Sequence, residues 1–303
     1  MSIEKAINDI DAKYRALGEN PETYLNGLLH AKPINYWDYV EVDTLLSLQK
    51  PRTEFNDELI FIIYHQLTEL VLKMMSHEIK QIVFESFSEE VWLDKINRLI
   101  RYTNLLISSF DIMKSGMSYD AYNTFRSTLT PASGFQSAQF RKIEIYCTRL
   151  ANLINHEGKK RLESNPSIED HFEHIYWKDA GYDRKTGKKT LTLSQFEEKY
   201  QDDFIALAKK INGSTIEELV LKQSQISDEL LEKLREFDHL YNVTWPLVHL
   251  STAQHYLNQK GDIKAATGGS EWVKYLHPKY QQRKFFPSLW SHEEIENWGT
   301  KHK

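Results

Sequence analysis

The amino-acid sequence predicts an all-α fold, and two observations lead to that prediction. Helix-breaking residues are scarce: the 303 residues include only 12 Gly and 8 Pro, below the usual shares of about 7% and 5%. Apolar residues also recur every three or four positions over long stretches, as they do on one face of a helix. No stretch shows sustained alternation of polar and apolar residues with hairpin turns, so almost no sheet is expected.

The predicted helices cover most of the chain. Their approximate ranges are 3–17, 37–47, 57–86, 89–115, 118–128, 134–156, 194–211, 215–223, 226–240, 243–259 and 291–298. Residues 157–193 are polar and poor in aliphatic side chains, which indicates an excursion from the bundle rather than a second core. Residues 258–270 form the Gly-rich loop. With no internal repeat, the sequence predicts one domain over residues 1–303 with one polar insertion at about 157–193.

The composition is that of a soluble globular protein, with 41% hydrophobic and 27% charged residues. The net charge of −5 is spread along the chain, which argues against nucleic acid and an anionic membrane as partners. The single cysteine, Cys147, excludes a disulfide framework. The N-terminus MSIEKAINDIDAKYRAL lacks the apolar core of a signal peptide, and no apolar run approaches the ~20 residues that span a bilayer. A cytoplasmic location is therefore expected.

The predicted helix over residues 57–86 is apolar on two faces. One stripe consists of Ile63, Leu67, Leu70 and Met74. A second stripe on nearly the opposite side consists of Phe61, His65, Thr68 and Leu72. Such a helix is expected to be buried on both sides. His65 is then either a hydrogen-bonded core residue or part of a pocket.

The histidines give little indication of a metal held by several side chains. A di-iron site in a helical bundle needs two Glu-x-x-His pairs, and the sequence has one clear pair, Glu236 with His239. His171 and His174 have a suitable spacing, but they lie in the polar segment, where a solvated position is the simpler interpretation. Cys147 is interpreted as an inert packed thiol.

The segment TWPLVHLSTAQHYL contains a histidine suited to a different cofactor. Trp245, His249 and Tyr256 fall on one helical face, and the small residues Thr252 and Ala253 adjoin the histidine. Small neighbours leave room for a flat macrocycle, and a single axial histidine suits haem iron. The alternative is a core histidine in a tightly packed helix pair.

An arginine lies among apolar neighbours in the segment YDAYNTFRSTL. Arg126 follows Tyr122 by one helical turn and precedes Leu129. A guanidinium in an apolar wall needs an anion, and its planar fork matches a carboxylate in two-point fashion. The alternative is an internal salt bridge with one of the 43 acidic residues. The segment ATGGS could contact a ligand through bare backbone and the Thr267 hydroxyl, or it is a flexible connection.

Taken together and in this order, these segments resemble the tryptophan 2,3-dioxygenase family. The resemblance covers YWDYVEVDTLLSLQKP, DELIFIIYHQLTELVLKMMSHE, FRSTLTPASGFQSAQFRKIE, TWPLVH, ATGGS and FFPSLW. It implies an all-α bundle that binds haem b, active with ferrous iron, and assembles as a homotetramer. It also implies a dioxygenase of the kynurenine pathway, which inserts both atoms of O2 across the C2–C3 bond of L-tryptophan to give N-formyl-L-kynurenine.

The resemblance assigns roles around the cofactor. His249 matches the proximal haem ligand, four residues after the family's tryptophan, here Trp245. His65 matches the distal histidine that accepts the indole N–H of the substrate. Phe61, one turn earlier, would pack against the indole ring and border the haem.

The resemblance also assigns the substrate contacts. Arg126 matches the arginine that pairs with the substrate carboxylate, and Thr267 matches the threonine at the amino-acid end of the substrate. Other matching pocket positions are Tyr122, Leu129, Ser133 and Gly134. In the family an N-terminal element reaches the neighbouring subunit's site, so residues 1–50, with Tyr36 and Tyr39, would serve another chain.

Some positions depart from the family pattern. Pro246 stands where an arginine near the haem is usual, and Ala266 replaces a glycine. Val40 stands where leucine is usual, and the loop after His249 is about four residues longer than expected. Since proline inside a helix costs ~3 kcal/mol outside the first turn, the helix should start or kink close to Pro246.

The sequence is also compatible with two other functions. One keeps the fold and haem but changes the reaction, to hydroxylation of tyrosine or oxidation of a modified indole. The other is a haem- or tryptophan-binding sensor without turnover. The joint presence of Phe61, His65, Arg126 and Thr267 favours tryptophan as the substrate.

Overall fold

The computed structural model describes residues 1–129, 134–162, 164–183, 186–257, 273 and 276–300. Within these ranges the chain is helical and has no β-strand, only two isolated bridges, Ile154 with Ile175 and Tyr182 with Lys189. The prediction of an all-α fold is confirmed.

The chain divides into two units, residues 1–50 and 51–303. The first unit consists of α1 (Ile3–Ala16), α2 (Pro21–His30), α3 (Tyr36–Val40) and α4 (Val42–Leu46). Pro21 is its only buried residue, so this unit has no hydrophobic core of its own. The helix α2 is absent from the predicted set, although an Asn20 cap and a proline at the first helical position are a clear start signal.

The second unit contains the core. Its long helices are α5 (Asn56–Phe84), α6 (Glu89–Ser115), α11 (Leu191–Ile211), α13 (Asp228–His239) and α14 (Trp245–Leu257). Its shorter helices are α7 (Tyr119–Phe125), α8 (Ala138–Cys147), α9 (His156–Arg161), α10 (Ile168–Glu173), α12 (Ile216–Lys222), α16 (Pro278–Gln281) and α17 (His292–Glu296). Its 3-10 helices are η1 (Arg126–Leu129), η2 (Gly134–Gln136), η3 (Leu150–Asn152), η4 (Tyr176–Gly181) and η6 (Pro287–Leu289).

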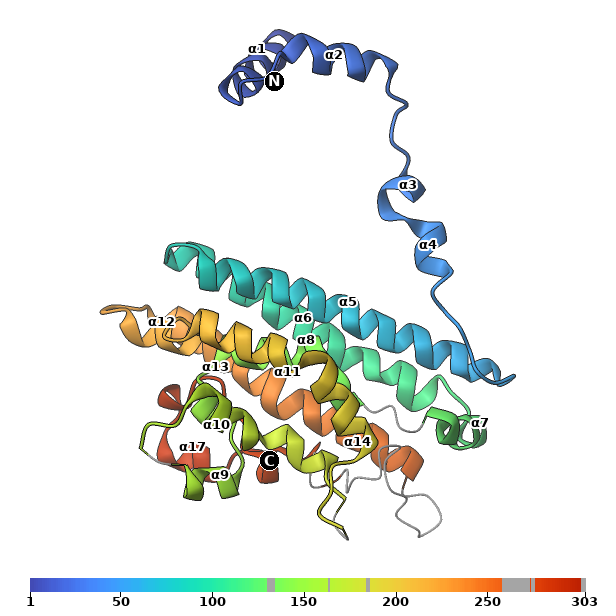
Figure 1. The fold of residues 1–303 in the computed structure, drawn as a ribbon, viewed down its shortest axis with the longest axis vertical. Helices are drawn as coiled ribbons and strands as arrows, with labels where there is room; N and C mark the ends of the chain where they lie inside the picture. The colour runs from blue at the N-terminus through green and yellow to red at the C-terminus, as the bar shows by residue number, and fades with distance from the viewer. Residues whose placement is uncertain (130–133, 163, 184–185, 258–272, 274–275, 301–303) are drawn as a thin grey trace. The chain divides into compact units, whose positions relative to one another are not determined.

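The centre of the second unit is built around α5 and α6. These two helices lie side by side, α8 packs on α5, and α13 and α14 pack on α6 (Figure 1). The largest fully buried side chains include Trp92, Phe204, Phe237, Tyr241 and Phe285. Cys147 is also fully buried, and burial raises the pKa of its thiol well above the ordinary value, which agrees with an inert packed cysteine.

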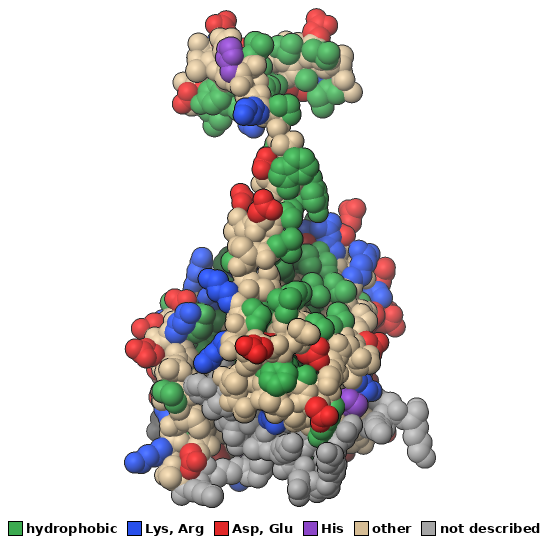
Figure 2. Space-filling model, turned by 90° about the vertical axis from the view of Figure 1, so that its right-hand side faces the viewer, with side chains coloured by type: hydrophobic (Ala, Val, Ile, Leu, Met, Phe, Trp, Pro, Cys, Tyr) green, Lys and Arg blue, Asp and Glu red, His purple; other side chains and the backbone are tan. Residues whose placement is uncertain are grey.

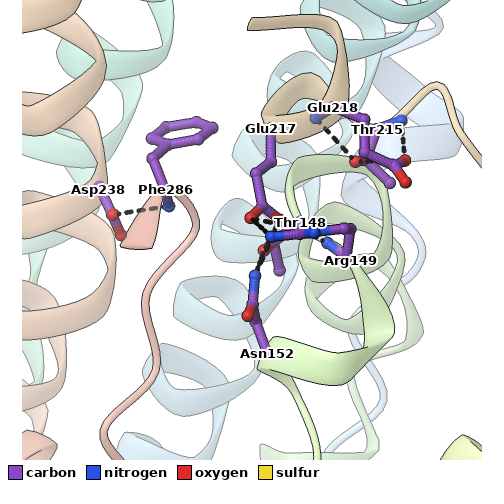
Figure 3. Close-up of polar contacts among 8 residues, drawn as sticks. All are labelled: Thr148, Arg149, Asn152, Thr215, Glu217, Glu218, Asp238 and Phe286. Carbon is purple, nitrogen blue, oxygen red and sulfur yellow. Dashed lines mark hydrogen bonds and ion pairs between the residues drawn. The ribbon is translucent and has the colours of Figure 1, made fainter. Parts of the chain in front are cut away.

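The predicted helix over residues 134–156 is wrong in its second half, because α8 ends at Cys147. The backbone turns extended at Thr148, and the buried Glu217 carboxylate of α12 holds it there (Figure 3). Glu217 accepts hydrogen bonds from the Thr148 hydroxyl, at 2.8 Å, and the Arg149 backbone N–H, at 2.9 Å. It also accepts from the Arg149 guanidinium and the Asn152 amide. This turn depends on a residue some 70 positions away, which helical spacing does not reveal.

The segment over residues 157–193 is not a polar excursion, which corrects the sequence interpretation. Phe172, Ile175, Tyr176 and Trp177 are buried in the main hydrophobic core. Trp177 packs edge-on against Phe196 of α11, with ring centroids 5.4 Å apart. A few large side chains anchor this segment, so its low aliphatic content hides its contribution to the core.

The helices α13 and α14 form one continuous helix with a π-helical turn between them. The turn, η5 (Leu240–Thr244), keeps right-handed helical backbone at both ends, and the Trp245 N–H donates to the Leu240 carbonyl five residues back. Pro246 follows directly. A proline clashes with the carbonyl four residues before it and cannot donate to it, and a wider π turn relieves this conflict. The predicted break near Pro246 is therefore a change of helical register.

The outer side of α5 is exposed, which corrects the expectation that this helix is buried on both sides. Ile63, Leu70 and Met74 are 47%, 46% and 41% exposed, while Val71 and Met75 on the inner side are buried. Among the described helices, α5 alone has the length and hydropathy that would let a helix cross a membrane, despite its polar residues. The core helix of a soluble protein meets the same criterion, and the inner side of α5 packs in the core.

Candidate active site

His65 lies near the middle of α5 with its protonation pattern fixed by the helix. Its Nδ1 is 2.7 Å from the Phe61 carbonyl oxygen one turn earlier. A carbonyl only accepts, so Nδ1 carries the hydrogen and Nε2 of the neutral ring is an acceptor. Burial lowers the pKa of His65, opposed by the bond to Phe61 and the charge of Glu69. The ring therefore offers an unprotonated nitrogen near neutral pH.

His249 lies in α14, one turn after Trp245. Burial, and then the ring of His65, lowers the pKa of His249 to about 4. The ring stacks on Phe110 of α6, with centroids 5.3 Å apart and an interplanar angle of 29°. Within the described part of the chain, neither ring nitrogen has a hydrogen-bond partner. A neutral imidazole with an unengaged lone pair is the form that binds iron.

The surroundings of the two histidines indicate that they face a common hollow. Each ring is surrounded closely enough for burial to dominate its pKa, yet each keeps exposed surface. Rings that are surrounded and still accessible lie on the walls of an internal hollow rather than on an outer surface. The ring of His65 contributes to lowering the pKa of His249, so α5 and α14 place the two rings near each other.

Aromatic side chains form one wall of the hollow. The Phe61 ring lies 4.1 Å from His65, 5.7 Å from Phe125 and 6.1 Å from Tyr122, measured between centroids. Tyr122 in turn contacts Tyr256 of α14 at 4.4 Å. The wall thus runs from the α5 histidine across α7 to the helix of the other histidine.

Arg126 stands beside this wall at the start of η1. Its guanidinium interacts with the Tyr122 hydroxyl and opposes the increase in the pKa of Tyr122 that burial causes. The start of α7 is fixed to α5, because the Ser118 N–H donates to Asp57 at 2.6 Å. An arginine half-buried next to aromatic rings is suited to hold a carboxylate.

The remaining predicted pocket positions differ in exposure, and two of them are not described. Leu129 is half-buried, and Gly134 is exposed, with open space where a Cβ would stand. Ser133 and Thr267 lie outside the described residues. Tyr36 and Tyr39 belong to the first unit and are 72% and 76% exposed.

Trp245 contacts aromatic side chains of the core. It packs against Phe140 at 5.3 Å and against Tyr241 at 5.2 Å. Its role beside a cofactor stays a prediction, whereas its contacts explain its burial and the anchoring of the start of α14.

The structure adds two features that the sequence does not reveal. Phe110 supports His249, although its spacing in α6 is that of any core residue. Gln139 of α8 donates to the Glu69 carbonyl at 2.7 Å and to the Glu69 carboxylate at 2.9 Å, which holds this charge one turn after His65. Only the contact across two helices distinguishes either residue from its neighbours.

The hollow fits a haem held by one axial ligand. No group of three or more His, Cys, Asp or Glu side chains able to hold a bare metal ion occurs among the described residues. One neutral histidine, a second histidine across the hollow and aromatic walls are the donor set and surroundings that haem iron takes. The fold and this site define the class of all-α proteins with a histidine-lined site whose donor set suits haem.

Comparison with known proteins identifies the family. The family model of tryptophan 2,3-dioxygenase matches residues 27–233, so the chain belongs to this family. A tryptophan 2,3-dioxygenase of Herpetosiphon aurantiacus is 29% identical over 273 residues, covering 86% of this chain and 98% of that protein. One from Bacillus thuringiensis subsp. konkukian is 28% identical over 286 residues, covering 90% and 98%. One from Ruegeria pomeroyi is 28% identical over 268 residues, covering 86% and 92%.

Proposed function

We propose that this protein is a haem-dependent dioxygenase that cleaves the indole C2–C3 bond of L-tryptophan with O2, giving N-formyl-L-kynurenine. The observation that carries the proposal is the pair of neutral histidines on α5 and α14 that share one hollow. Family membership and relatives named tryptophan 2,3-dioxygenase support the reaction. We assign the protein to tryptophan catabolism in the cytoplasm, without a nucleic-acid or membrane partner.

His249 is the proposed axial ligand of haem b, with Phe61 and Trp245 as the proposed neighbours of the cofactor. Ferrous haem, when bound, supplies the activation of O2. The Phe110 ring holds the His249 ring against rotation by stacking on it. The low pKa of His249 keeps the lone pair available at all pH values above about 4.

His65 is the proposed acceptor of the indole N–H. Its Nδ1–H is used by the Phe61 carbonyl, so the nitrogen that remains is an acceptor and cannot donate in the neutral ring. The Phe61 ring beside it supplies a flat apolar surface for an indole. Together the two side chains orient the substrate, which lowers the barrier by holding it in a reactive geometry.

Arg126 is the proposed partner of the substrate carboxylate, beside Tyr122, Leu129 and Gly134. Its guanidinium lies next to the same aromatic wall as His65. Two fixed points, one at the carboxylate and one at the indole nitrogen, define the orientation of an amino acid with an indole side chain. Thr267, at the amino-acid end of the substrate, and Ser133, as a further pocket position, complete the proposed set.

The first test is an aerobic assay of reduced, haem-loaded protein with L-tryptophan, followed by the near-ultraviolet band of N-formylkynurenine. Wild-type protein should form product, and His255→Ala, a change on the same helix as the ligand, should do so too. Arg126→Ala should lower kcat/KM by at least about 30-fold, since removing one partner of a hydrogen-bonded charge pair costs about 2–5 kcal/mol. Arg126→Lys should recover only part of this loss.

Two results would replace this proposal by the alternatives. Turnover of tyrosine or a modified indole, with none of tryptophan, would keep the haem site and change the substrate. Tight binding of haem and tryptophan without product would make the protein a sensor. Protein that takes up no haem under any condition would contradict all of these functions.

We also propose that the protein acts as a homotetramer in which residues 1–50, with Tyr36 and Tyr39, reach a neighbouring subunit's site. The first unit buries one residue, and the second exposes the apolar outer side of α5; Figure 2 shows hydrophobic side chains at the surface of both units. Apolar patches of this kind mark interaction surfaces. Light scattering should give the mass of four chains, and Ile63→Glu should reduce it, while Lys80→Glu on an exposed turn of the same helix should not.

A further inference from the structure

Asp238, near the end of α13, is a fully buried carboxylate held by four donors. Oδ1 accepts from the Asn242 amide at 2.8 Å and the Phe285 backbone N–H at 2.9 Å. Oδ2 accepts from the Phe286 backbone N–H at 3.0 Å (Figure 3). It also accepts from the Trp290 indole N–H at 2.9 Å. All four donors are neutral, and each pairs with one oxygen lone pair, so the side chain has one orientation.

These donors join two parts of the chain that the reaction mechanism leaves without a role. Asn242 lies inside the π turn η5, one turn after Asp238. The other three donors belong to the segment FFPSLW, residues 285–290. Arg235 strengthens the same contact, donating to the Leu289 carbonyl at 3.0 Å and lying 4.5 Å from the Trp290 ring. The segment is thus a brace against the junction of α13 and α14.

The π turn decides where the residues after it point. A π turn adds one residue to a helix, and one residue corresponds to a rotation of about 100°. His249 follows η5 by five residues, so its direction depends on whether Leu240–Thr244 keep the π register. Without the extra residue, α14 would present a different side chain toward Phe110 and the hollow.

We infer that Asp238 is a positioning residue for the proposed haem ligand: it holds the π turn in register through Asn242 and the 285–290 segment, and thereby aims His249 at the iron. The inference rests on the proposed function. Asp238 does not touch the hollow itself, and it acts through η5 and α14. Phe237 and Tyr241, which both pack on Phe285 at 5.7 and 5.1 Å, form the apolar part of the same brace.

Asp238→Asn is the test, because it keeps the shape of the side chain. It replaces one carboxylate oxygen, an acceptor, by an amide NH2, which then faces N–H groups that have lost their acceptor. Glu217→Gln is the matched control. Glu217 is also a buried carboxylate held by several donors, and it joins α12 to the turn after α8 rather than to α14 (Figure 3). Both changes should lower the urea midpoint of unfolding. Only Asp238→Asn should alter the position of His249.

The first measurement is hydrogen exchange of the haem-free proteins. The Trp245 amide, which makes the π-type bond to Leu240, should exchange at least about tenfold faster in Asp238→Asn than in wild type. In Glu217→Gln its exchange should be unchanged. Asn242→Ala, which removes one of the four donors and leaves the carboxylate, should give a smaller increase of the same kind.

The second measurement is the iron–histidine stretching band and the haem dissociation rate of the loaded proteins. Asp238→Asn should shift or broaden the band and release haem about 10- to 100-fold faster, the usual cost of losing a support behind a metal ligand. Glu217→Gln should match wild type in both. If Asp238→Asn fails to fold, Asn242→Ala and Trp290→Phe make the same comparison with a single donor removed.

The outcomes separate this inference from the proposed function. Wild-type protein without histidine-ligated haem would contradict the proposed function. Wild-type protein with a normal iron–histidine band, and an Asp238→Asn protein equal to it in exchange and band, would overturn the inference alone. Equal changes in Asp238→Asn and Glu217→Gln would also overturn it, because they would reduce Asp238 to a general contributor to stability.

Discussion

The helices that carry the two histidines are built in different ways. α5 runs without interruption from Asn56 to Phe84, and its own carbonyl at Phe61 fixes the hydrogen on His65. The helix of His249 is interrupted by a π turn, and its ring is held by stacking on Phe110 rather than by a hydrogen bond within the described residues. The same residue type is thus prepared for two tasks, one as a fixed hydrogen-bond acceptor and one as a ligand with an unengaged lone pair.

The largest effect should come from His249→Ala compared with His65→Ala. His249→Ala should lose haem and with it all activity, because it removes the proposed axial ligand and leaves in the hollow only His65, the proposed partner of the substrate. His65→Ala should keep haem and lose about 5- to 150-fold in kcat/KM, which corresponds to the cost of about 1–3 kcal/mol for a buried hydrogen bond left unmade. Haem content from the pyridine haemochrome spectrum and initial rates give both values. Haem loss in His65→Ala with retention in His249→Ala would reverse the assignment.

The next effect tests the stacked support of His249. Phe110→Leu keeps an apolar side chain but removes the ring contact, which is worth about 0.5–1.5 kcal/mol. Haem affinity should fall by about two- to tenfold, measured by transfer of haem to apomyoglobin. Phe87→Leu, which removes a similar ring contact with Trp92 at 5.1 Å, is the control and should leave haem affinity unchanged. A normal affinity in Phe110→Leu would show that stacking does not hold the ligand.

A third effect is the pH dependence of stability in the haem-free protein. His249 has a folded-state pKa of about 4, below the unfolded value of about 6.5, so the unfolded chain binds more protons between these limits. The neutral ring thus favours the folded state fully above pH 6.5, and this advantage is lost as the pH falls toward 4. The urea midpoint of wild type should fall more between pH 7 and 5 than that of His249→Phe. Parallel curves for the two proteins would contradict this.

The smallest effect concerns the charge beside His65. Glu69 raises the pKa of His65 against the effect of burial, so Glu69→Gln should lower it further. The acidic limb of the kcat/KM profile should move to lower pH, by less than about one unit because the charge acts without a direct bond. Glu85→Gln, at the exposed end of α5, should leave the limb in place. A shift to higher pH would show that Glu69 acts in another way.

Local pattern was enough to predict most of the helices and the spacing of neighbouring side chains, while the roles of the candidate site residues came from the resemblance to the family. Helical spacing places His65 one turn from Phe61, and Tyr122 one turn from Arg126, and the structure keeps both pairs together. Proline chemistry predicts the irregularity at Pro246. These predictions succeed because each depends on neighbours within one or two turns.

Features that depend on distant residues could not be predicted in this way. The end of α8 is set by Glu217, and the role of Phe110 by α14. The exposed side of α5 is apolar, so its composition is the same whether it packs in a core or against another chain. The burial of Trp177 depends on Phe196 of α11, and a single large ring outweighs the polar residues around it.

The buried thiol of Cys147 can report how often the core around α8 opens. The thiol is fully buried at the end of α8, and its raised pKa leaves almost no thiolate in the folded chain. A thiol reagent should therefore modify the folded protein only when the core around α8 separates. Because the sequence has one cysteine, the mass of labelled protein after short pulses reads out the rate of that separation directly, without any engineered probe.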